Sequence, residues 1–267
     1  MIKKVLYISL WSVLIIGLFV TLGFVDKEQN NLPCKSLDIN INHDDENFFI
    51  EQEEVKQIIH DRGDSIINEP LASIDIKELE YVLNSHPAVA KAEVYVSVNG
   101  EVKVDIAQRK PIVRIIDNNN ESYYIDDSGK LMPLSEKYTA RVLIANGILI
   151  EPYARRYKYS MEAIIQNPEV KDKTMLDDIY ILAKYINADE FWNAQVEQLY
   201  VNSDREFELV PRVGDHKIIF GDITDYEEKF KKLMIFYKEG LNSTNSWNSY
   251  SAINLKFKNQ IVCTKKE

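Results

Sequence analysis

The sequence predicts an α+β fold in two parts, preceded by an apolar N-terminal segment. From residue 36 to 106 the order is strand, helix, helix, strand, strand, judged from apolar residues that alternate or recur at helical spacing. Because two helices can cover one face of a three-stranded sheet, we expect a small α+β domain there. Strand patterns dominate after residue 110, which indicates a larger β domain with flanking helices.

The N-terminal segment has the length and composition of a membrane anchor. Residues 5–25 carry no charge, and about 20 apolar residues span a bilayer core as a helix. Lys3 and Lys4 favour a cytoplasmic N-terminus and translocation of the remainder. The alternative is a cleaved signal peptide, whose apolar region is about 7–15 residues long and ends in small residues. We favour an uncleaved transmembrane helix, with 1–4 as cytoplasmic tail and 26–35 as linker.

Composition and charge exclude several classes of protein. The 267 residues are 45% hydrophobic and 28% charged, as in globular proteins, and the net charge of −10 offers no basic face for nucleic acid. Two Cys are too few for a disulfide-rich scaffold or a four-cysteine zinc site. Beyond residue 25 there remain 30 basic and 42 acidic residues, a charge of −12, which we interpret as a solvated acidic surface.

Each element of the first domain has its own local signal. Alternating apolar residues predict a strand at 36–41, and a helical stripe with acids in its first turn predicts a helix at 51–59. A second helix begins near Asp75, because Asp75 and Glu78 have the spacing of a capping box. Pro87 ends it, since the residue before a proline leaves helical geometry.

Two valine-rich strands close this domain. The dipeptide Asn99-Gly100 between them favours a two-residue turn, but that turn would place the two valine rows on opposite faces. We therefore predict a three-residue connection with Gly100 in the left-handed region, which puts Val96 opposite Val102.

The second domain shows further strands and helices. A turn at 126–129, with Gly129 in the left-handed position, joins two short strands. We expect strands at 123–125, 130–132, 141–145, 196–201, 206–211, 217–220, 253–257 and 261–264, and helices at 175–186 and 226–237. The apolar stripe of the last helix is an alternative partner-binding surface, but core packing is the commoner role.

The last two strands form the hairpin on which the candidate site depends. A three-residue turn at 258–260 would pair Phe257 with Ile261 and Leu255 with Cys263. Cys263 would then be a small buried hydrophobe. A disulfide with Cys34 is an alternative in an oxidising compartment, which we do not favour because Cys34 lies beside the anchor.

No motif indicates catalysis. The four His (His43, His60, His86 and His216) form no HxxxH or HExxH pair, and no phosphate-binding glycine motif occurs. Asp126-Asp127 and Asp177-Asp178 are candidate paired carboxylates, but adjacent acids in a turn or a first helical turn are usually solvated. Arg109 beside Lys110 is a candidate anion site, for which a strand-end charge pair is the commoner explanation. We predict no catalytic residue, no metal site and no cofactor.

The order of these segments resembles the FtsQ/DivIB family of bacterial cell division proteins, in its Bacteroidetes-type form. A short tail, one anchor and a domain at 36–110 that resembles a POTRA module precede a β domain at 111–267. The resemblance rests on Gln108-Arg109-Lys110-Pro111-Ile112-Val113-Arg114 and on the segment from Tyr123 to Leu134. Outer-membrane assembly factors also contain POTRA units, but they lack this anchor.

The resemblance implies a non-enzymatic divisome scaffold. It would be a single-pass protein of the inner (cytoplasmic) membrane at the division septum, with its bulk in the periplasm. It would bind FtsB-like and FtsL-like partners and other divisome components, bind no nucleic acid, and help regulate septal peptidoglycan synthesis. The alternative is a membrane-tethered POTRA chaperone or envelope assembly factor that binds extended client proteins.

The resemblance also carries a partner-binding role onto the last hairpin. It falls on Phe257, Lys258, Asn259, Gln260, Ile261 and Val262. No later strand follows in the sequence, so we expect an edge strand whose unpaired backbone groups bind a partner strand. A proline at Val262 is expected to remove one such donor. The alternative is an interior strand, in which these residues are core and turn.

Overall fold

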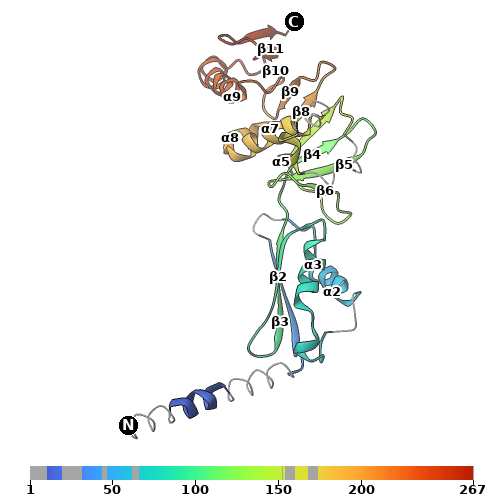
Figure 1. Ribbon diagram of the computed structural model, residues 1–267. Coiled ribbons are helices and arrows are strands. Elements are labelled where there is room, and N and C mark those ends of the chain that lie inside the picture. The colour runs from blue at the N-terminus through green and yellow to red at the C-terminus, as the bar shows by residue number, and fades with distance from the viewer. Residues whose placement is uncertain are drawn as a thin grey trace. The chain divides into compact units, whose positions relative to one another are not determined.

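The computed structural model of the protein describes residues 11–19, 32–43, 47–61, 66–151, 153, 160–167 and 174–266. The chain divides into two units, an N-terminal unit up to Gln108 and a C-terminal unit from Arg109 onwards. Figure 1 shows a small sheet with helices beside it in the first unit and a large sheet with helices in the second.

The predicted anchor lies largely outside the described residues. Residues 11–19 are helical and exposed, whereas 5–10 and 20–25 fall outside, as do the predicted tail and most of the predicted linker. Within the described part of the chain, every helix is too short or too polar to cross a membrane.

The N-terminal unit is a three-stranded sheet with its helices on one face (Figure 1). Its elements are β1 (Ser36–Asn42), α2 (Gln52–His60), a 3-10 turn (Leu71–Ser73), α3 (Ile76–Asn84), β2 (Val89–Val96) and β3 (Glu101–Gln108). β3 lies in the centre, parallel to β1 and antiparallel to β2. The predicted order of strands and helices is therefore confirmed; the 3-10 turn was not predicted.

The predicted helix cap and the predicted hairpin turn of this unit are both present in the structure. Asp75 caps α3, because its Oδ1 accepts the Glu78 N–H at 3.1 Å. Val96 pairs with Val102, and Gly100 has a φ of +88°, so the hairpin has the register that its valines require. The predicted hairpin is thus confirmed.

The C-terminal unit is built on a nine-stranded sheet of order β12-β11-β10-β9-β8-β7-β4-β5-β6. Its strands are β4 (Pro111–Ile116), β5 (Ser122–Asp126), β6 (Leu131–Pro133), β7 (Leu143–Gly147), β8 (Val196–Val201), β9 (Phe207–Pro211), β10 (Lys217–Gly221), β11 (Tyr250–Asn254) and β12 (Val262–Lys265). Among the described residues its helices include α5 (Met161–Ile165), α7 (Leu176–Ala188), α8 (Glu190–Gln195), α9 (Tyr226–Ile235) and a π-helical turn (Phe236–Asn242). β4, α5 and α8 were not predicted.

The core of this unit lies between the sheet and its helices. Phe230 and Leu233 of α9 are fully buried there, together with Trp192 of α8. The rings of Phe230 and Trp192 lie 5.0 Å apart. The apolar stripe of α9 therefore packs in the core and is not a partner-binding surface, which was the alternative considered from the sequence.

Asp126 corrects one interpretation from the sequence. It is buried in the turn between β5 and β6 instead of being solvated. Its Oδ1 accepts hydrogen bonds of 2.7 Å from the Ser128 hydroxyl and the Lys130 N–H, and Arg109 Nη1 lies 3.4 Å from Oδ2. The carboxylate thus organises a turn, and Arg109 is part of a charge pair.

A buried histidine makes the stability of the C-terminal unit depend on pH. His216 is 5% exposed, its Nε2 lies 3.3 Å from the Tyr237 hydroxyl, and the ring of Trp247 packs beside it. Asp215 and Lys266 are the charged groups that act on it. Burial lowers the pKa of His216, so the folded unit keeps the ring neutral where the unfolded chain binds a proton.

We expect the free energy of unfolding to fall as the pH drops below about 6.5, because the unfolded state then binds more protons. Urea unfolding at several pH values, followed by tryptophan fluorescence, measures this. A His216→Gln chain should lose much of the slope. Burial also lowers the pKa of His86 in the N-terminal unit. The part of the pH dependence that His86 contributes should therefore remain in this variant. An unchanged slope in His216→Gln would assign the effect to another group.

Candidate partner-binding edge

β12 forms one border of the large sheet. Among the described residues it pairs with β11 alone. The opposite border is β6, a strand of three residues that ends at Pro133. Because a short strand with a proline offers few free backbone groups, β12 is the better candidate for pairing with another chain.

The last hairpin differs from its predicted register by two residues. Ile253, not Leu255, pairs with Cys263, and residues 255–261 connect the strands in place of a three-residue turn. The reason is that the Leu255 N–H donates to the Ile219 carbonyl of β10 at 2.9 Å. After Asn254, which pairs with the first residue of β12, the chain therefore stays beside β10 for one more residue instead of turning back at once.

A lysine of α9 holds this connection against the helix. Lys232 Nζ donates to the carbonyls of Phe257 at 2.7 Å, Lys258 at 3.3 Å and Leu255 at 3.4 Å. An ammonium group has three donors, and all three are used here. Burial, followed by the positive charge of Lys229, lowers the pKa of Lys232. The connection is therefore fixed by contacts far away in sequence.

The pairing also shows which backbone groups of β12 face outwards. Because Leu255 bonds to β10, the preceding Asn254 directs its N–H and C=O at β12. Asn254 pairs with Val262, so the amide of Val262 is used inside the sheet. Cys263, the next residue, directs its N–H and C=O to the open edge. Val262 is thus not the free donor that we expected from the sequence.

The six predicted residues lie together at this edge. The connection holds Phe257, Lys258, Asn259 and Gln260, which are exposed, and Ile261, which is half-buried. Val262 begins β12 and is 42% exposed.

Cys263 is a further residue of this edge, and Ile235 is exposed on helix α9, whose Lys232 contacts the connection. Cys263 packs against the core, and burial raises the pKa of its thiol. Neither Cys263 nor the buried Cys34 takes part in a disulfide. Ile235, which the sequence patterns did not single out, is 59% exposed on α9, one turn beyond Lys232. Its only signal in the sequence is an isoleucine outside the buried stripe of its helix.

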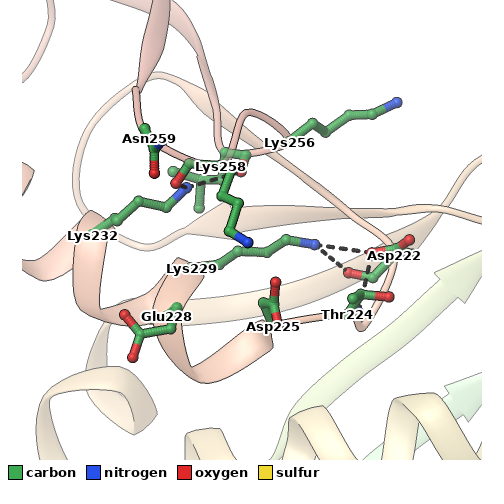
Figure 2. Close-up of a pocket in the computed structure, with 10 residues that line it drawn as sticks. Asp222, Thr224, Asp225, Glu228, Lys229, Lys232, Lys256, Lys258 and Asn259 are labelled. Atoms are coloured by element: carbon green, nitrogen blue, oxygen red, sulfur yellow. Dashed lines mark hydrogen bonds and ion pairs between the residues drawn. The ribbon is translucent and has the colours of Figure 1, made fainter.

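A charged pocket of about 720 Å³ borders the connection (Figure 2). Its lining consists of Asp222, Thr224, Asp225, Glu228, Lys229, Lys232, Leu255, Lys256, Lys258 and Asn259. Lys229 is buried and donates to the carbonyl and Oδ1 of Asp222, at 2.7 and 3.1 Å. Burial by itself would raise the pKa of Asp222. The hydrogen bond and the positive charge of Lys229 outweigh burial, so the pKa is lowered overall. The charges of the pocket thus brace the turn after β10.

In the N-terminal unit, by contrast, helix side chains cover an edge strand. The Ala92 N–H donates to Asn84 Oδ1 at 2.9 Å, and Asn84 Nδ2 donates to the Ala92 carbonyl at 3.1 Å. Glu80 Oε1 accepts the Val94 N–H at 2.9 Å. These backbone groups are the ones that an added strand would use. The outer edge of β2 is therefore already occupied by α3.

Removing this cover should expose the edge. In an Asn84→Ala chain we expect the Ala92 amide to exchange about fivefold faster, because one hydrogen bond of about 1 kcal/mol is lost. Hydrogen exchange read by NMR measures this. Ser85→Ala is the matched control, since that hydroxyl bonds to Tyr81 within the same helix. Equal exchange in the two variants would contradict the capping role of Asn84.

Two family models match the chain. A model described as FtsQ/DivIB, C-terminal related, matches residues 110–264, and one described as a POTRA-like domain matches residues 32–107. The first range holds the nine-stranded sheet and reaches into β12, and the second holds the three-stranded sheet. No curated protein matches the chain.

Proposed function

Because this chain belongs to the FtsQ/DivIB family and carries a POTRA-like domain, we propose that it is a scaffold of the bacterial division machinery. Both matched domains are of non-catalytic, scaffolding types. Its role is to bind other division proteins through the domains outside the membrane and to help regulate septal peptidoglycan synthesis.

The partner site in this proposal is the β12 edge. An FtsB-like chain adds a strand alongside Cys263 and contacts the residues from Phe257 to Val262, in a complex that also holds an FtsL-like protein. The observation that carries the proposal is the open edge of β12, whose adjoining connection Lys232 fixes in place. A preformed edge lowers the entropic cost of binding, since only the partner has to become ordered.

The membrane arrangement follows from the charge-free run at 5–25. Residues 1–4 are cytoplasmic, 5–25 span the inner membrane, and 26–35 link the anchor to a POTRA-like domain at 36–110 and a β domain at 111–267. Protease added to spheroplasts should digest everything beyond residue 25 and spare the anchor. A mature protein that begins after residue 25 would show a signal peptide instead.

The competing function is an assembly factor whose POTRA-like domain binds extended clients. That function needs a free strand edge. Asn84 and Glu80 occupy the edge of β2, so an extended client would have to add to β1, the other border of that sheet. Purification of the tagged full-length chain from dividing cells separates the two. One small coiled-coil partner supports the division scaffold, whereas a wide range of outer-membrane proteins would support the assembly factor.

A further inference from the structure

Three exposed aliphatic side chains gather at one end of the N-terminal unit. Leu32 is 38% exposed, Ile67 is 44% exposed, and Val98, in the turn between β2 and β3, is 85% exposed. We call these three residues the apolar tip. They come from three separate segments of the chain, and none of the three belongs to the buried core of the unit.

Backbone hydrogen bonds join these segments. The Lys35 N–H donates to the Gly100 carbonyl at 2.9 Å, beside Val98. The Asn68 N–H, next to Ile67, donates to the Cys34 carbonyl at 2.8 Å. Figure 1 shows the β2–β3 turn and the start of β1 at the same end of the unit. The tip is therefore part of the folded unit and is held in place by its sheet.

This end of the unit is also where the chain leads to the proposed anchor. Six residues, 26–31, separate Leu32 from the end of the charge-free run. Fully extended, the steps from residue 25 to 32 span at most about 25 Å. The proposed anchor thus keeps the tip near the bilayer at a high effective concentration, so that even weak contacts are made.

We propose that the apolar tip docks on the lipid surface. The occupant is the bilayer interface, because the chain itself tethers the tip there and aliphatic side chains gain free energy when they enter it. Docking would fix the orientation of the N-terminal unit on the membrane. It would also keep the unit close to the bilayer surface, where membrane-anchored partners are found. The inference rests on the proposed anchor.

The test places a probe on the tip of the full-length chain. Val98→Cys is labelled with the fluorophore NBD in a Cys263→Ser background, since Cys34 is buried, and the protein is reconstituted into phosphatidylcholine vesicles with or without doxyl-labelled lipid. Ala90→Cys, exposed at the other end of β2, is the matched control. We expect quenching to be about twofold stronger at Val98, because interfacial side chains lie 5–10 Å deep.

A second variant removes the docking without touching the probe. Leu32→Asp combined with Ile67→Asp changes two exposed side chains and should reduce the quenching at position 98 to the level of the control. Flotation of the vesicles tests the anchor separately. A chain that does not float overturns the anchor and this inference together. A chain that floats with equal quenching at positions 98 and 90 overturns the docking alone.

Discussion

A Cys263→Pro substitution should strongly weaken binding of the FtsB-like partner while the C-terminal unit stays folded. The Cys263 N–H faces the open edge, so the ladder with β11 does not lose a bond. Proline is tolerated at such edge positions, but it removes the donor that an added strand needs. We expect affinity to fall about 30-fold or more, since neighbouring bonds are disturbed as well. Calorimetric titration with the partner measures this.

Two companion variants make this result specific. Cys263→Ala keeps the backbone donor and should bind like the original chain. Val262→Pro removes an N–H that bonds to β11, so it should disrupt the hairpin itself and reduce both stability and binding. Undiminished binding by Cys263→Pro would exclude the β12 edge as the partner site.

The largest loss of stability is expected from Gly147→Ala. Gly147 ends β7 with a φ of +109°, and a Cβ there would lie 2.2 Å from the Val201 carbonyl oxygen and 2.7 Å from the Val201 nitrogen. Backbone atoms of a central strand cannot move aside. The substitution should therefore cost about 4 kcal/mol or more, enough to unfold many domains.

Gly100→Ala is the matched control for this variant. Gly100 also has a positive φ, of +88°, but the nearest atom to its Cβ would be 3.6 Å away. It carries only the conformational cost, about 1 kcal/mol. Urea unfolding of the full-length chain, followed by circular dichroism, compares the two. Similar small losses in both variants would show that β7 and β8 can separate at this point.

Much of the fold could be predicted, because its signals are local. The valines around the β2–β3 turn select one register, since the alternative would bury polar side chains. Asp75 marks the start of α3 through a bond to a residue three positions away. Gly129 marks the turn between β5 and β6 through its φ of +78°.

The candidate site was predicted only in its position along the chain. The six residues lie at one edge, but the connection that carries them is longer than expected, because Leu255 pairs with Ile219 instead of continuing the hairpin. Lys232 stabilises that arrangement from a helix more than 20 residues earlier. No pattern within the hairpin reveals either contact.

Local patterns in the sequence were enough to predict the α+β class, the order of elements in the N-terminal unit and the family to which the chain belongs. These depend on periodicity, capping and turn chemistry, which act over a few residues. The tertiary structure alone decided that β12 borders the sheet, that Cys263 and not Val262 faces outwards, and that Asn84 closes the edge of β2. These features depend on which distant segments meet, and several partners satisfy the same alternating pattern until the whole sheet is assembled.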